Sequence, residues 1–106
     1  MHAGSNPSRG TMNWKVEKLQ AGEVIISKEP GNSMTPIIES KQAVEITPCT
    51  WEECEKGDIV YCKVNGNLYT HLVKGKNLKR GLSIGNNHGY VNGWTKKVYG
   101  KVTKIL

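Results

Sequence analysis

The segment IVYCKVNGNLYTHLV, residues 59–73, decides the fold class of this chain. Its first six residues are rich in the β-branched and aromatic side chains that favour strands. Asn65-Gly66 follows, and this dipeptide favours a two-residue hairpin turn because both residues adopt positive φ readily. A second β-rich run covers residues 68–73. The segment therefore predicts two antiparallel strands, 59–64 and 68–73, joined by a tight turn.

Short apolar runs on both sides of this hairpin are bounded by Gly, Pro or Asn, as strands usually are. They predict further strands over residues 24–26, 43–47, 82–84 and 97–106. We expect the last strand to be interrupted at Gly100. Helix is expected only as single turns, over 34–39 and over 50–53 with Thr50 as the cap. Residues 85–93, dense in Gly and Asn, are expected to form a long turn or, alternatively, a recognition loop beside the candidate site.

These expectations describe a mainly β protein, a single small antiparallel β domain with partly coiled sheets and little helix. The length of 106 residues fits one domain, and a hydrophobic content of 37% is ordinary for a globular protein. Residues 1–12 are polar and rich in Gly and Ser, so we expect a flexible segment there and the β domain over 13–106. Met12 is a second candidate for the natural start.

The chain has no apolar run near the roughly 18 residues of a membrane span, and residues 1–9 do not resemble a secretory signal. We therefore expect a cytoplasmic protein without membrane contact. Cys49, Cys54 and Cys62 are odd in number and form no CxxC pair, so free thiols are expected. The sequence shows no four-ligand zinc set, and we expect neither a metal nor a cofactor.

The net charge of +6 is unevenly distributed along the chain. Residues 1–55 carry five Lys or Arg and eight Glu, whereas residues 56–106 carry ten Lys or Arg and one Asp. This asymmetry indicates either a solvated basic face or attraction to an anionic partner, such as nucleic acid or the acidic half of a second copy in a homodimer. The candidate anion-binding residues are Lys74, Lys76, Lys79, Arg80, Lys96 and Lys97.

Ser33 is the first candidate for chemistry. It lies between Pro30-Gly31-Asn32 and Met34-Thr35-Pro36, at a predicted junction between a loop and a helical turn. A serine there exposes its hydroxyl, and its own backbone N–H lies where developing negative charge is favoured. The alternative is that Ser33 only caps the helical turn, a common role of serine.

His71 is the second candidate. In the predicted strand 68–73, Tyr69, His71 and Val73 share one face, and the following Lys74 lies on the opposite face. A histidine on a strand is commonly structural, but it can act as a general base if the fold brings it to Ser33. Lys74 is the fallback base.

The order of several short motifs resembles the LexA/signal-peptidase superfamily, above all its small stand-alone members from phages and bacteria. Five boxes carry the resemblance: Gly31-Asn32-Ser33-Met34-Thr35-Pro36, Gly57-Asp58-Ile59-Val60, Tyr69-Thr70-His71-Leu72-Val73, Gly85-Asn86-Asn87 and Gly100-Lys101-Val102. The resemblance implies the small β fold, a serine nucleophile at Ser33 whose backbone N–H helps to bind the oxyanion, and a base at His71. His71-Leu72-Val73 is similar to the His-Arg-Val form found in one branch of the superfamily.

The family's histidine branch uses a later aspartate to orient the imidazole, and this chain departs from that pattern. No Asp or Glu follows Asp58, so Asn86 and Asn92 are the candidates for orienting His71. An asparagine can orient a histidine, but it cannot stabilise the imidazolium by charge. Asp58 itself precedes a predicted strand and is expected to accept backbone hydrogen bonds in a turn.

Two functions therefore remain open on the sequence. The first is a serine peptidase-like protein with a Ser33–His71 dyad, weak or inactive, that acts on a peptide or protein substrate or on its own N-terminal arm. In that arm Ala21-Gly22 resembles the small-residue sites cut by LexA-type proteins. The second is a non-catalytic module that binds nucleic acid or a protein through the basic C-terminal half.

Overall fold

The computed structural model describes residues 14–29, 37–38 and 41–106. Ser33, the N-terminal segment 1–12 and most of the predicted helical turn over 34–39 lie outside these residues. In chain order the elements are α1 (Trp14–Gln20), β2 (Ile25–Glu29), β3 (Gln42–Pro48), the 3-10 helix η1 (Trp51–Glu53), β4 (Ile59–Val64), β5 (Asn67–Asn77), β6 (Gly81–Gly85), β7 (Val91–Thr95) and β8 (Val98–Ile105).

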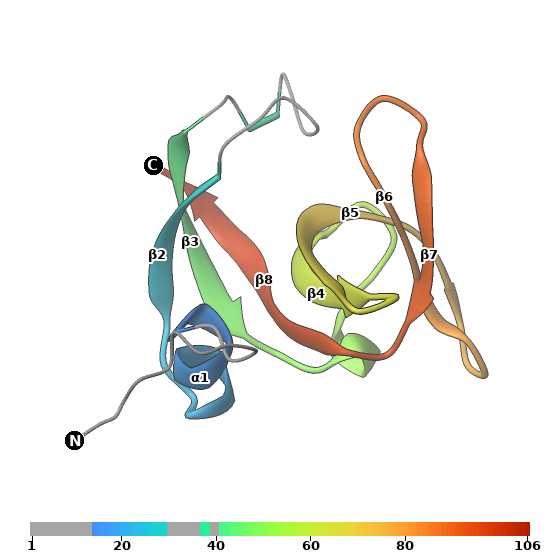
Figure 1. Cartoon of the computed structure of the whole chain (residues 1–106), viewed down its shortest axis with the longest axis horizontal. Coiled ribbons are helices and arrows are strands. Elements are labelled where there is room, and N and C mark those ends of the chain that lie inside the picture. The colour runs from blue at the N-terminus through green and yellow to red at the C-terminus, as the bar shows by residue number, and fades with distance from the viewer. Residues whose placement is uncertain (1–13, 30–36, 39–40) are drawn as a thin grey trace.

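The described strands form one sheet in the order β2-β3-β8-β4-β5-β6-β7, and every neighbouring pair is antiparallel. The sheet is strongly coiled: β2, β3 and β8 lie on one side of the molecule, and β4 to β7 curl around on the other (Figure 1). Helix α1 packs against β2, β3 and β8. The prediction of a mainly β antiparallel domain with little helix is confirmed.

The predicted hairpin at the centre of the sequence is also confirmed. Strand β4 pairs with β5 from Ile59 opposite Leu72 to Val64 opposite Asn67. The turn residues Asn65 and Gly66 have φ values of 50° and 85°. Positive φ at both positions is the signature of the type I′ turn, whose twist matches that of the flanking strands.

Strand β4 is buried on both faces because it separates two hydrophobic clusters. Ile59 and Tyr61 point into the first cluster, and Val60, Cys62 and Val64 point into the second. The first cluster also contains Val16, Leu19, Ile25, Ile38, Val44 and Ile46. The second also contains Cys54, Val73, Leu82 and Ile84. The period-2 alternation of one strand thus supplies side chains to both cores.

The structure contains two elements that the sequence did not predict. Helix α1 is only seven residues long, and its buried positions are Val16 and Leu19, too few for a clear helical period. Strand β7 begins within the expected turn over residues 85–93, where Gly93 has a φ of 140°. Pairing with β6 stabilises β7 despite this weak propensity, since Ser83 lies opposite Trp94 and Ile84 opposite Gly93.

The expected interruption at Gly100 is wrong. Strand β8 continues through Gly100, which pairs with Pro48 on one side and Tyr61 on the other. A Cβ atom at this position would lie 2.7 Å from the carbonyl oxygen of Thr47 and 3.1 Å from a methyl carbon of Leu19. Glycine is therefore required here by the close approach of β3 and α1, rather than by a break in the strand.

Candidate functional site

His71 lies near the middle of β5, opposite Val60 of β4. Its side chain is on the predicted face with Tyr69, and the two rings stack with centroids 4.8 Å apart and planes inclined by 24°. Only 8% of His71 is exposed. The imidazole is therefore held in one orientation by its strand and by the tyrosine ring, a contact that the i, i+2 spacing of the two residues already indicates.

The structure brings His71 and Asn92 together. Nδ1 of His71 lies 2.7 Å from Oδ1 of Asn92. An amide oxygen only accepts hydrogen bonds, so Nδ1 carries the proton and donates it to Asn92. In the neutral ring Nε2 is then the basic nitrogen, the state that a general base needs. Of the two candidate asparagines, Asn86 and Asn92, it is therefore Asn92 that accepts the hydrogen bond of the His71 ring.

A β-bulge explains how Asn92 reaches the histidine. Ile84 pairs with Gly93 and Gly85 pairs with Val91, so Asn92 is the extra residue on β7. Bulges redirect the side chain of the inserted residue and increase the local twist of the strand. Gly93, with its φ of 140°, supplies the backbone conformation that the distortion requires.

Asn86, the other candidate, has a different contact in the structure. Its Oδ1 accepts the backbone N–H groups of His88 at 2.8 Å and Tyr90 at 3.0 Å, and its own N–H donates to the Tyr90 carbonyl. Asn86 therefore organises the turn between β6 and β7.

Lys74 follows Val73 at a register shift in β5, and a Cβ on Gly85 would lie 2.9 Å from its Cε. The fallback base is thus beside β6.

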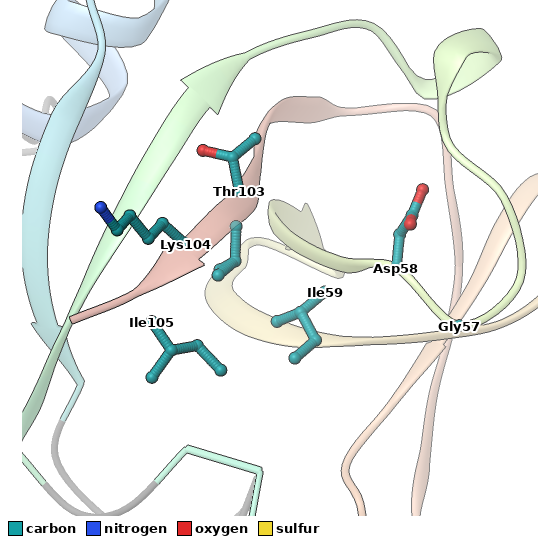
Figure 2. Close-up of a pocket in the computed structure, with 7 residues that line it drawn as sticks. Gly57, Asp58, Ile59, Thr103, Lys104 and Ile105 are labelled. Atoms are coloured by element: carbon teal, nitrogen blue, oxygen red, sulfur yellow. The ribbon is translucent and has the colours of Figure 1, made fainter.

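Ser33 lies outside the described residues, and its approach to His71 stays a prediction. A surface hollow of about 340 Å³ lies between the start of β4 and the end of β8. It is lined by Gly57, Asp58, Ile59, Val102, Thr103, Lys104 and Ile105. Figure 2 shows Ile59 and Ile105 projecting to the same side of this hollow, with Asp58 projecting the other way.

The hollow exists because β4 and β8 separate there. Their pairing runs from Cys62 opposite Val98 to Val60 opposite Lys101. Beyond Lys101, strand β8 continues its pairing with β3 as far as Ile105. In the described part of the chain, the edge of β8 that faces β4 is therefore unpaired over residues 102–105. Val60, where the two strands part, is also the residue opposite His71.

The predicted structural role of Asp58 is confirmed. Its Oδ2 accepts the backbone N–H of Glu55 at 2.9 Å, and its backbone carbonyl accepts the N–H of Val73 at 2.8 Å. The same carboxylate oxygen lies 3.8 Å from Nζ of Lys101. Asp58 thus closes the turn before β4 and ties it to β8.

Some of the candidate anion-binding residues contact other groups of the chain, and others are exposed. Nζ of Lys76 donates to the carbonyl oxygen of Glu52 at 2.8 Å and lies 3.2 Å from Glu55 Oε2. The guanidinium of Arg80 lies over the ring of Trp94, and Nζ of Lys96 lies over that of Trp51. Lys79 and Lys97 are exposed.

Two features bear on the membrane and metal expectations. Among the described helices, none has the length and apolar character needed to cross a bilayer. Within the same residues, no three His, Cys, Asp or Glu side chains gather where they could hold a metal ion.

Comparison with known proteins adds no relative. The chain matches no protein-family model, no curated protein and no solved structure.

Proposed function

We propose that this protein is a serine peptidase-like domain of the LexA/signal-peptidase type, in which Ser33 is the nucleophile and His71 the general base. The observation that carries the proposal is the 2.7 Å hydrogen bond from His71 Nδ1 to Asn92. It leaves Nε2 as the basic nitrogen of a histidine that is 8% exposed. The motif order in the sequence supplies the serine.

The chemistry follows from these groups. His71 Nε2 takes the proton of the Ser33 hydroxyl while Oγ attacks the peptide carbonyl, and the imidazolium then gives that proton to the leaving amine. The backbone N–H of Ser33 donates to the oxyanion. Asn92 keeps the imidazole in the correct tautomer throughout, as asparagine does in Cys-His-Asn proteases.

Asparagine in place of aspartate predicts slow turnover. A neutral amide orients the ring and fixes its tautomer, but it does not stabilise the imidazolium by charge as a carboxylate does. The domain is therefore suited to a rare or single cleavage event rather than to bulk digestion.

An extended peptide is the substrate class that the hollow supports. The unpaired edge of β8 over residues 102–105 offers backbone donors and acceptors to an added strand. Ile59, Val102 and Ile105 line the hollow with apolar surface for alternate side chains. Val60 lies opposite both His71 and Lys101, so only β4 lies between the start of this edge and the strand that carries the histidine.

A separate peptide fits better than the chain's own Ala21-Gly22. The N–H of Ala21 donates to the carbonyl of Glu17 and that of Gly22 to the carbonyl of Leu19, so both residues belong to the turn that ends α1. Peptidases of this kind bind extended backbone, and cleavage there requires this turn to open.

Active-site labelling tests the proposal. We expect a fluorophosphonate probe to label the wild-type protein, Ser33→Ala to abolish labelling and His71→Ala to slow it at least about a hundredfold. His88→Ala, in the exposed turn after β6, is the matched control and should label at the wild-type rate. Equal labelling of Ser33→Ala and wild type, or no labelling together with no cleavage of a peptide library, would overturn the assignment.

Binding of single-stranded nucleic acid is a second candidate, and one contact favours it. Trp94 is 40% exposed, and Arg80 lies over its ring at 5.6 Å. A base can stack on such a pair while neighbouring lysines contact phosphates. We expect Trp94→Ala to weaken an oligonucleotide gel shift at low salt and Lys104→Ala, on the distant end of β8, to leave it nearly unchanged. Absence of any shift at low salt contradicts this candidate.

A further inference from the structure

A pair of thiols lies apart from His71, at the junction between β3 and β4. Cys49 directly follows β3 and Cys54 directly follows η1. Their Sγ atoms are 3.5 Å apart. The short helix brings them together, because the carboxylate of Glu53 accepts the backbone N–H of Thr50 at 2.8 Å and folds the segment back on itself.

The two thiols differ in accessibility. Cys49 is partly exposed and lines a surface hollow of about 360 Å³ together with Leu19, Gln20, Pro48, Thr50, Val98 and Tyr99. Cys54 is fully buried in the second hydrophobic cluster. A small reagent can therefore reach the sulfur of Cys49 from solvent, whereas Cys54 is closed to solvent.

The surroundings also favour a thiolate on Cys49. The hydrogen bond from Cys54 and the nearby Lys101 ammonium lower the pKa of Cys49, against the opposing effect of burial. The same hydrogen bond and burial raise the pKa of Cys54. The single S–H hydrogen of Cys54 can donate either to the Cys49 sulfur or to the carbonyl oxygen of Thr50, 3.4 Å away.

We propose that Cys49 and Cys54 form an oxidisable dithiol, in which the Cys49 thiolate attacks a hydroperoxide and Cys54 resolves the resulting sulfenic acid as an internal disulfide. The Cys49 thiolate displaces hydroxide from hydrogen peroxide, which forms the S–O bond of a sulfenic acid and breaks the O–O bond. The Cys54 sulfur then attacks the Cys49 sulfur, its proton leaves with the hydroxyl group as water, and the S–S bond forms. Two thiols lose two electrons, and one peroxide gains them.

The step needs little movement. A disulfide has about 2 Å between its sulfur atoms, so the pair must close by roughly 1.5 Å from its present 3.5 Å. Cys49 is partly exposed directly after β3 and can shift toward Cys54, whose S–H then gives up its hydrogen bond to the Thr50 carbonyl. This inference is independent of the peptidase proposal, since neither thiol belongs to the Ser33–His71 site.

Cys62 is the internal control. It is fully buried on β4, and burial raises its pKa to about 12. Trypsin cleavage after lysine also places Cys62 on a different peptide from the thiol pair. Peptide 42–56 carries Cys49 and Cys54, and peptide 57–63 carries Cys62.

Treatment of the full chain with hydrogen peroxide, followed by alkylation, digestion and mass spectrometry, tests the proposal. In the wild type we expect peptide 42–56 to lose about 2 Da, the mass of two hydrogens, and to take up no alkylating reagent, while Cys62 is alkylated after unfolding. In Cys54→Ser the sulfenic acid should persist on Cys49 and be trapped by dimedone. Cys62→Ala should behave like the wild type.

Alkylation of the reduced wild type before any oxidation supplies a measurement that needs no variant to fold. Cys49 should react with iodoacetamide at least about tenfold faster than Cys62. Equal rates for the two residues, a disulfide that includes Cys62, or disulfides only between chains would each overturn the proposal.

Discussion

The Nδ1 atom of His71 lies 2.7 Å from Oδ1 of Asn92, although β6 separates the strands that carry them. The contact is possible because β6 ends at Gly85, opposite Leu72, and His71 lies one position beyond that last pair. The β-bulge at Asn92 then turns the amide toward the ring. A strand end and a bulge thus create a side-chain pair that no regular ladder would allow.

Asn92→Asp should increase the activity of the proposed site. A carboxylate in this position still accepts the Nδ1 proton and also stabilises the imidazolium, so the pKa of His71 should rise. We expect labelling by the fluorophosphonate probe to accelerate at least about tenfold, with the titration of His71 in NMR spectra moving to higher pH.

Asn92→Ala is the matched comparison for that substitution. It removes the acceptor and the tautomer preference, so labelling should slow while Ser33→Ala stays inactive. If Asn92→Asp and Asn92→Ala have the same labelling rate as the wild type, Asn92 does not orient a catalytic histidine.

Adjacent isoleucines on β2 test the position of the first core. Ile25 is 5% exposed and Ile26 is 51% exposed. Ile25→Ala should lower the free energy of unfolding by about 2–5 kcal/mol, because it removes buried methyl groups and leaves a cavity. Ile26→Ala should change it by no more than about 0.5 kcal/mol. Urea unfolding of both variants checks this, and equal effects would mean that β2 does not present alternate residues to the core.

Local signals made the centre of the fold predictable from the sequence. Asn65-Gly66 and its flanking β-rich runs define a hairpin whose geometry depends on neighbouring residues alone. The same holds for the capped turn at Thr50. Helix α1 and β7 could not be predicted for two reasons. Helix α1 packs on β8, which is distant in the sequence, whereas β7 pairs with the preceding β6 from a Gly- and Asn-rich segment of weak strand propensity.

The candidate site was predictable in its residue types but not in its pairing. The sequence offers Asn86 and Asn92 as equal partners for His71. Only the bulge in β7 distinguishes them, and a bulge depends on the register between two strands. The thiol pair was missed for a similar reason, because a spacing of five residues brings Cys49 and Cys54 together only through the η1 turn.

Substitution of Gly100 and of Gly75 by alanine distinguishes a glycine that is required by close packing from one that is not. A Cβ on Gly100 would lie 2.7 Å from the Thr47 carbonyl oxygen, whereas one on Gly75 would meet nothing closer than 3.9 Å. Gly100→Ala should therefore destabilise the protein by about 1–3 kcal/mol. Gly75→Ala should be neutral or stabilise it by up to about 1 kcal/mol, since alanine restricts the unfolded chain. Thermal unfolding of both variants measures the difference, and a tolerated Gly100→Ala would contradict the close approach of β3 and β8.

Because Cys62 is buried, the free energy of unfolding should decrease at alkaline pH. Its pKa is raised from 9.0 to about 12 by desolvation, so between these values the unfolded chain has lost a proton that the folded chain retains. Stability from this group is fully present below pH 9 and decreases as pH rises toward 12. By pH 11 the loss should reach about 2–3 kcal/mol.

Cys62→Ala isolates that contribution from the lysines and tyrosines that also titrate there. Its cavity lowers stability by a constant amount at every pH, but its unfolding free energy should decrease less steeply above pH 9 than that of the wild type. Urea titrations of both proteins from pH 8 to pH 11 give the two slopes. Parallel slopes would mean that the thiol ionises as readily in the folded chain as in the unfolded one, and that β4 is not buried on the face that carries Cys62.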